Sequence, residues 1–452
     1  MRRMASDACQ GKADWRVSGE AATVSVSDEA ARPRQRSQDA GQDLLSQVLA
    51  RANLQGAWKR VKANRGAAGV DGLDIARTGA QLKTAWPDIR DQLRNGQYRP
   101  NPVRRVSIPK SSGGERELGI PTVTDRLIQQ ALLQVLQPLI DPHFSNHSHG
   151  FRPGRSAHDA VLNAQRHVQA GYRVVVDVDL ERFFDHVCHD ILMAKLTRYV
   201  ADRAVLRLIR AYLDAGILID GVVCRRHAGT PQGGPLSPLL ANVMLDEVDR
   251  ELERRGQRFE RYADDCNIYV RSHRAGQRVL AGLRKRYAKL KLCINETKTT
   301  IRSAFGAKFL GYALWQTPGG EVKRAVAAQA VNAYKRRMRQ LTRRNGGRSM
   351  TEVIDKLRTY VRGWKAYFRL AQTPRVWLTL DQWLRHRLRA IQLKHWTRGK
   401  TIYREARRLG AHPNVAQRAA SGAGHWWRAS TLALNGVLTF AYFDRIGAPR
   451  LC

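Results

Sequence analysis

Two aspartates end a valine-rich segment of the sequence, Val174-Val-Val-Asp-Val-Asp179. Its composition predicts a β-strand, in which successive side chains point to opposite faces, so Asp177 and Asp179 share one face. A carboxylate at the end of an apolar strand is costly to bury unless it binds a cation or a basic partner. This segment is therefore a candidate cation site.

A second acidic pair, Asp264 and Asp265, occupies the turn of Tyr-Ala-Asp-Asp between predicted short strands at 258–262 and 266–270. Asp is common in turns, so the pair taken alone is explained equally well as turn residues. Together with Asp179, however, it suits a site for two Mg²⁺ ions. Nucleotidyl transfer uses two such ions roughly 3.5–4 Å apart, and Mg²⁺ prefers a few carboxylates plus substrate phosphates.

The elements that must position these residues are predicted to alternate between strands and helices up to about residue 315. The segment 103–110 is predicted to be a strand that ends in a hairpin turn, Ser-Ser-Gly-Gly, at 111–114. Another strand is predicted over 173–180, and apolar spacing becomes helical from Leu44. Further helices are predicted over 123–139, 192–213 and 237–254.

The composition indicates a nucleic-acid partner. The 452 residues, 43% of them hydrophobic, suffice for two to four domains, and they carry a net charge of +39. Self-repulsion on this scale favours a polyanionic partner, and an anionic membrane surface is the competing one. We find no apolar run of 18 residues and no signal-peptide core, and the six scattered cysteines form no CxxC pair, which is typical of a reducing compartment.

The two ends of the chain differ from its middle. Residues 1–45 lack periodicity and are predicted to be a disordered extension. Residues 321–452 carry 28 Lys and Arg against six acidic residues, and they contain six of the ten Trp. We predict a helical region there, whose basic faces contact nucleic acid and whose Trp side chains are mainly core.

The sequence resembles a known family, the group II intron-encoded reverse transcriptases/maturases. From about residue 50 to 315, five blocks occur in the family's order: Gly150-Phe-Arg-Pro-Gly-Arg-Ser-Ala-His158, Asp179-Leu-Glu-Arg-Phe-Phe-Asp185, Gly229-Thr-Pro-Gln-Gly-Gly-Pro-Leu-Ser-Pro238, Tyr262-Ala-Asp-Asp265 and Phe309-Leu-Gly-Tyr312. The segment 360–368 and an Arg-rich helix at 383–398 resemble the family's maturase (thumb) domain.

The resemblance implies an α+β fold: right-hand polymerase fingers and palm with an antiparallel palm sheet, followed by an all-α thumb/maturase domain. The expected divisions are the extension (1–45), fingers and palm (46–315), thumb/maturase domain (316–398) and a basic helical segment that is a candidate DNA-binding appendage (399–452). No Cys or His cluster follows Tyr403, so the resemblance is to the form without the zinc-supported endonuclease domain.

The resemblance also implies roles for particular residues. Asp179, Asp264 and Asp265 are the expected catalytic residues and metal ligands, and the backbone carbonyl of Leu180 completes the metal shell. Asp177 matches no catalytic position of the family and is expected to be a structural or supporting acid. The expected nucleotide-binding residues are Lys110, Arg116, Phe184, as the gate under the incoming sugar, and Gln232. Lys298 is a candidate proton donor, with a surface lysine as its alternative. The expected RNA-binding residues are Arg362, Lys365, Arg385, Arg387 and Arg389.

The implied partners are group II intron RNA, an RNA template with its DNA primer, target DNA and dNTPs, without a membrane, in the cytoplasm and associated with the nucleoid or a ribonucleoprotein. The implied activity is RNA-directed DNA synthesis together with intron splicing and retrohoming. Three alternatives stay open: a domesticated reverse transcriptase in repair or phage defence, an RNA-binding maturase without catalysis, and an RNA-templated RNA polymerase. The intact set of three aspartates disfavours the second alternative, and Phe184 disfavours the third.

Overall fold

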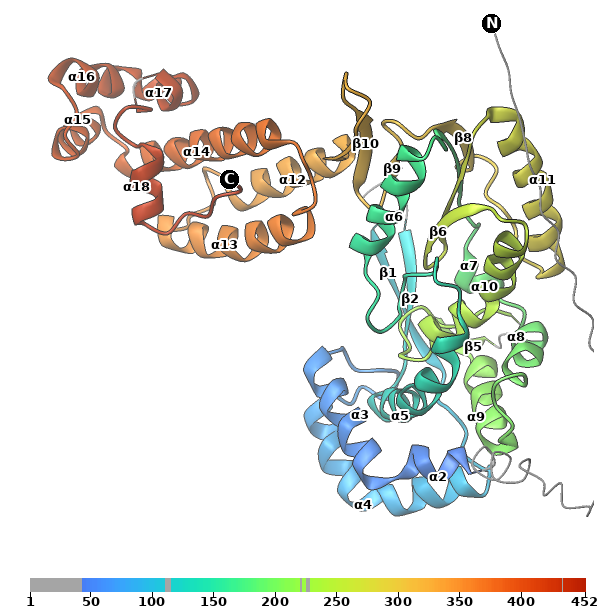
Figure 1. Cartoon of the computed structure of the whole chain (residues 1–452). Coiled ribbons are helices and arrows are strands. Elements are labelled where there is room, and N and C mark those ends of the chain that lie inside the picture. The colour runs from blue at the N-terminus through green and yellow to red at the C-terminus, as the bar shows by residue number, and fades with distance from the viewer. Residues whose placement is uncertain (1–42, 110–114, 220–221, 225–227, 433) are drawn as a thin grey trace, which may run out of the picture.

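The computed structural model of the chain is shown in Figure 1. It describes residues 43–109, 115–219, 222–224, 228–432 and 434–452. Most of the expected N-terminal extension, residues 1–42, lies outside the described residues, whereas α2 begins at Leu44, where helical spacing begins in the sequence. Within the described ranges, no helix is long and apolar enough to cross a membrane.

The first part of the chain combines a helical layer with a four-stranded sheet of order β2-β1-β4-β5. Its helices are α2 (Leu44–Leu49), α3 (Arg51–Asn64), α4 (Ile75–Arg94) and α5 (Val123–Ile140). Its strands are β1 (Val103–Pro109), β2 (Glu115–Ile120), β4 (Ile217–Ile219) and β5 (Val222–Cys224). The Thr122 side chain caps α5 by accepting the amide of Asp125. Buried apolar residues run along α5, which makes it the central helix of this part.

The second part is built on an antiparallel sheet of order β6-β7-β3-β8. Its strands are β3 (Val174–Val178), β6 (Arg258–Tyr262), β7 (Asp265–Val270) and β8 (Thr300–Ser303). Helices α6 (Ala157–Gln169), α10 (Ser237–Arg254) and α11 (His273–Lys289) pack on it. Val175 packs with α6 on one face, whereas Val176 and Val178 pack with α10 and α11 on the other. Because both faces are covered, β3 is almost entirely apolar up to the aspartates.

Three helices connect β3 to β4: α7 (Phe183–His186), α8 (His189–Leu196) and α9 (Arg203–Asp214). The prediction of a single helix over 192–213 is therefore wrong. One carboxylate oxygen of Asp202 accepts the amides of Ala204 and Val205 and starts a new helix. Its other oxygen accepts the amide of Leu45 at 2.9 Å, so this break also anchors α2.

A small sheet of order β11-β10-β9 leads into the C-terminal helices. Its strands are β9 (Lys308–Phe309), β10 (Tyr312–Gln316) and β11 (Val322–Val326). The expected boundary at 315/316 falls inside β10. The helical region begins at Ala328, after β11. The α-helices there are α12 (Ala328–Leu341), α13 (Met350–Tyr367), α14 (Pro374–Trp396), α15 (Gly399–Arg408), α16 (Pro413–Ser421), α17 (Trp426–Leu432) and α18 (Phe440–Arg445). Short 3₁₀ turns lie at η1 (Asp141–His143) and η2 (Gly422–His425).

These C-terminal helices, orange to red in Figure 1, share one hydrophobic core. Leu384 of α14 and Phe443 of α18 are both buried in that core. Asp381 accepts the amides of Leu451 and Cys452 at 3.0 Å, so the last residues are fixed against α14. The segment 399–452 therefore packs in the same hydrophobic core as the rest of the helical domain. The expected α+β class, with an antiparallel sheet followed by a helical domain, is confirmed.

Candidate active site

The sheet register brings the two acidic segments together. Strand β3 pairs with β7 from Val174 opposite Val270 to Val178 opposite Cys266. One further step along the same register sets Asp179 beside Asp265. Like-charge interactions link Asp265 to Asp264, Asp177 and Asp179, as their proximity requires. The carboxylates that the sequence places about 85 residues apart thus form one acidic group at the end of the sheet.

The turn that carries Asp264 is a two-residue hairpin closed by the pair Tyr262 and Asp265. Its first central residue, Ala263, has a φ of 60°. Positive φ at this position is the type II′ pattern that usually calls for glycine. An L-residue there costs roughly 1–2 kcal/mol, so other parts of the fold must hold the turn in place.

Two neighbours hold it. Arg261 donates from its guanidinium to the carbonyl oxygen of Ala263 at 2.8 Å. Gly150 lies so close that a Cβ on it would be 2.3 Å from the Ala263 nitrogen. Asn242 of α10 donates to the Gly150 carbonyl at 2.9 Å, which fixes this approach.

Arg261 is itself buried and paired with Asp249 of α10, with Nε 2.8 Å from a carboxylate oxygen. The same guanidinium contacts Asn242 and the Ser148 hydroxyl, so a fully bonded buried ion pair underlies the turn. Sequence reasoning missed this clamp. The available signal was Asp249 itself, a carboxylate on a helix face that otherwise carries Leu245 and Leu252.

The electrostatics of the acidic group favour a bound cation. Burial and then the neighbouring Asp177 and Asp264 raise the pKa of Asp265 to about 7. Burial also raises the pKa of Asp177, although the Arg302 guanidinium 2.7 Å away opposes this shift. Hard divalent cations relieve such repulsion and prefer oxygen ligands. The donor set at this place therefore fits Mg²⁺ chemistry.

The segment 293–299 runs alongside residues 179–181, just after β3, and does not bond the carbonyl of Leu180. Its bonds to β3 join the Asn295 amide to the Asp179 carbonyl and the Glu181 amide to the Cys293 carbonyl. The bridge at Leu180 uses neither polar group of Leu180, because both point away from the partner segment in this part of an antiparallel ladder. That carbonyl orientation is compatible with the expected metal-ligand role of Leu180.

Lys298 lies in the same segment and its Nζ is 3.5 Å from an Asp179 carboxylate oxygen. Its side chain is 63% exposed. Lys298 is therefore a surface lysine that also lies beside the acidic group, so its position does not distinguish the proton-donor role from that of an ordinary surface lysine.

Phe184 is buried at the start of α7 and lies against the Gly229–Gly234 loop. Its carbonyl accepts the Thr230 amide at 2.7 Å, and a Cβ on Gly229 would lie 2.9 Å from the same oxygen. The carbonyl of Gln232 in this loop accepts the Gly119 amide of β2 at 2.9 Å. The structure thus brings Phe184, Gln232 and β2 into one neighbourhood.

The basic residues expected to hold the triphosphate are only partly described. Lys110 lies outside the described residues. The backbone of Arg116 pairs with Ile108 in the β1–β2 hairpin, which the sequence predicted. Their roles therefore stay predictions.

The five expected RNA-binding residues fall into different environments. Arg362 and Lys365 of α13 are exposed. Arg385 and Arg389, in contrast, are 0% and 4% exposed, so the prediction that they form an RNA-binding surface is wrong. Arg385 bonds the Pro449 carbonyl and Asp444, and Arg389 bonds the Leu438 carbonyl. Arg387 is half-buried and donates to Thr342. The side chains of Arg385 and Arg389 thus anchor residues near the C-terminus instead of facing solvent.

Comparison with known proteins agrees with this architecture. Residues 108–314 match the reverse transcriptase (RNA-dependent DNA polymerase) family, and residues 331–410 match the group II intron maturase-specific domain. The chain is 39% identical over 191 residues to protein YkfC of Escherichia coli K12, which covers 41% of the chain and 50% of that protein. It is 37% identical over 206 residues to the group II intron-encoded protein LtrA of Lactococcus lactis, which covers 45% of the chain and 34% of that protein.

A solved structure, a partial Cas6-RT-Cas1–Cas2 complex, aligns with 57% of this chain and 44% of its own at a TM-score of 0.37 and 28% identity. That likeness is too low to support an inference. Of the two curated relatives, the chain spans about half of YkfC and about a third of LtrA.

The sheet, the acidic group and the two domain matches define a protein of the reverse transcriptase class. More narrowly, the match to the reverse transcriptase family is followed by a match to the group II intron maturase-specific domain, so the chain has the two domain types expected of a group II intron reverse transcriptase/maturase. Reverse transcriptases generally use divalent metal ions, and both domain types imply nucleic-acid substrates, intron RNA among them.

Proposed function

We propose that this protein is an RNA-directed DNA polymerase that also binds group II intron RNA as a splicing maturase and supports retrohoming of the intron. The observation that carries the proposal is the register of β3 and β7, which puts Asp179 beside the Asp264–Asp265 hairpin. Because the curated relatives are matched only over part of their length, the activity of the whole protein is inferred from these local features.

In the proposed reaction, Asp179, Asp264 and Asp265 would hold two Mg²⁺ ions, with the Leu180 carbonyl as a further ligand. Bound Mg²⁺ supplies Lewis acidity toward the attacking hydroxyl and the triphosphate. The turn strain at Ala263 and its buried support keep the carboxylates preorganised, which lowers the reorganisation needed during reaction. Lys298 Nζ donates a proton to the departing pyrophosphate.

The proposed substrates are dNTPs on an RNA template with a DNA primer. Phe184 lies under the sugar of the incoming nucleotide and excludes a 2′-hydroxyl by its bulk, which favours DNA synthesis. Gln232 lies against the same nucleotide, and Lys110 and Arg116 bind its triphosphate.

The proposed partners beyond the active site are intron RNA and target DNA. The net charge of +22 over residues 321–452 supports this, because each phosphate contact releases condensed counterions. Arg362 and Lys365 are exposed on α13 and remain candidates for RNA contact. We place the protein in a ribonucleoprotein or at the nucleoid.

Primer extension on poly(rA)/oligo(dT) tests the proposal. Asp264→Asn keeps the shape of the side chain and removes its charge, so we expect it to abolish Mg²⁺-dependent synthesis while RNA binding in a filter assay is retained. Asp88→Asn, at an exposed position of α4, is the matched control and should behave as wild type. Full synthesis by the Asp264 variant would overturn the site, and an inactive wild type would favour a non-catalytic maturase.

A further inference from the structure

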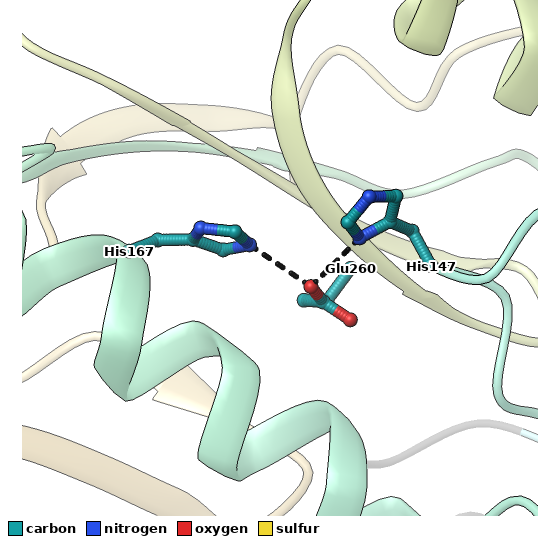
Figure 2. A group of neighbouring side chains, drawn as sticks. All are labelled: His147, His167 and Glu260. Carbon is teal, nitrogen blue, oxygen red and sulfur yellow. Dashed lines mark hydrogen bonds and ion pairs between the residues drawn. The ribbon is translucent and has the colours of Figure 1, made fainter.

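A cluster of imidazoles surrounds one carboxylate on the face of the sheet that α6 covers. His147 and His149 belong to the loop before α6, His167 lies near the end of α6, and Glu260 lies on β6. His147 Nδ1 and His167 Nε2 are 3.1 and 2.9 Å from the same oxygen, Oε1 of Glu260. Figure 2 shows the two rings pointing at that oxygen from different elements.

The other oxygen of Glu260 has separate partners. Oε2 accepts from His149 Nε2 at 2.5 Å and from the Asn163 amide at 3.4 Å. His149 and Glu260 are entirely buried at their side chains, whereas His147 is 29% exposed and His167 14% exposed. One oxygen is therefore fixed in the interior, and the other faces two imidazoles nearer to solvent.

The buried charge of Glu260 needs a positive charge beside it. Three neutral imidazoles satisfy the hydrogen bonds of Glu260 but leave a buried negative charge. His149 does not supply the balancing charge, because its Nδ1 is buried and has no partner among the described residues, so a second N–H there would be unpaired. The compensating charge must come from the side of His147 and His167.

We propose that His147 Nδ1, His167 Nε2 and Glu260 Oε1 form a site for a divalent transition metal of the Zn²⁺ class. Imidazole nitrogen together with one carboxylate oxygen is a ligand set that suits Zn²⁺ and disfavours Mg²⁺. The three donor atoms lie within 4.8 Å of one another. Bonds of about 2.1 Å in a tetrahedron set donors about 3.4 Å apart, so small side-chain rotations suffice.

His149 and Asn163 complete the arrangement from outside the ligand set. Ligating carboxylates are commonly oriented by hydrogen bonds to their second oxygen, and these two residues supply such bonds to Glu260. The partial exposure of His147 leaves a path for the ion and for a water as fourth ligand. The site is thus separate in chemistry from the aspartate group, which offers oxygen ligands alone.

A metal here would join three segments that converge on the catalytic hairpin. Ser148 bridges to Arg261 in parallel, and the amide of His149 donates to the Arg261 carbonyl at 2.9 Å. The loop that carries His147 continues into Gly150, which contacts the Ala263 turn. The metal would stabilise the loop, α6 and β6 as one unit behind that turn.

Metal binding by the full-length chain tests this proposal. The protein is stripped with a chelator and dialysed against Zn²⁺ with Mg²⁺ in excess, so that oxygen-ligand sites are filled. Bound zinc is then measured by elemental analysis, and Co²⁺ serves as a spectroscopic probe of nitrogen ligation. The double variant His147→Asn, His167→Gln keeps a hydrogen-bond donor at each position and removes both imidazoles. His273→Ala, at an exposed position of α11, is the control.

We expect one Zn²⁺ per wild-type chain, a higher unfolding midpoint with Zn²⁺, and Co²⁺ absorption bands in the visible range. The double variant should lose affinity by more than the ~10–100-fold that removal of an outer-shell partner typically costs, and the control should not. Wild-type protein that retains no zinc overturns the proposal even if the variant fails to fold. Equal binding by the folded double variant also overturns it, since the cluster would then be only a protonated hydrogen-bond network. These measurements do not depend on polymerase activity.

Discussion

Gly150→Ala tests how closely the hairpin that carries Asp264 depends on its support. The substitution adds one methyl group to a residue that lies against the backbone of Ala263, one residue before Asp264. The added Cβ would lie 2.3 Å from the Ala263 nitrogen, whereas ordinary contact begins at 3.4 Å. Because the nearest atoms are backbone, no side-chain rotation relieves the overlap.

The two segments must therefore separate by about 1 Å. The loop is held by the Asn242 bond to the Gly150 carbonyl, so part of this displacement falls on the turn that positions Asp264. A misplacement of about 1 Å at a reacting group costs up to about 100-fold in rate, which corresponds to about 2.7 kcal/mol in activation free energy. Overpacking itself destabilises by roughly 1–3 kcal/mol.

Steady-state primer extension on poly(rA)/oligo(dT), at several Mg²⁺ concentrations, measures the effect. We expect kcat to fall by up to about 100-fold at a temperature where circular dichroism shows the variant still folded. Gly56→Ala in α3 is the control, because its Cβ meets the Gln134 side chain at an ordinary 3.6 Å. Wild-type kcat in the folded Gly150 variant would refute the claim that this contact positions Asp264.

Three further predictions follow from the same structure. Phe184→Ala should raise ribonucleotide incorporation relative to dNTPs by removing bulk under the sugar, and an unchanged preference in a competition assay would contradict the gate role. The pKa of Asp265 is raised to about 7, so its proton competes with the cation, and the Mg²⁺ concentration for half-maximal rate should fall as pH rises from 6 to 8. The fall should be up to about tenfold per pH unit below pH 7 and small above it. A flat dependence would argue against Asp265 as a ligand. Replacing the exposed Arg362 and Lys365 with Gln should weaken RNA binding and make the slope of log K against log salt concentration shallower by about 0.7 per lost contact. Arg385→Gln should instead lower the unfolding midpoint and leave that slope unchanged, because Arg385 is buried. Filter binding at several salt concentrations and thermal unfolding distinguish these outcomes.

Local sequence patterns were enough to predict the elements that carry the acidic group. The valine run before Asp179, the Tyr-Ala-Asp-Asp turn and the helix at 237–254 all depend on local periodicity, and the structure has them where the sequence predicts them. A strand's side-chain alternation and a hairpin's turn residues are properties of neighbours along the chain. The order of motifs likewise indicated the family, which the domain matches bear out.

Which charged residues are buried depends, in contrast, on contacts between distant segments of the chain. Arg385 belongs to a strongly basic helix and was expected at a surface, yet it is enclosed by residues 59 to 64 positions later in the chain. The pairing of Arg261 with Asp249 and the convergence of His147 and His167 on Glu260 are equally long-range. Burial of a charge depends on partners that the fold brings from distant segments, and no local pattern encodes that distance.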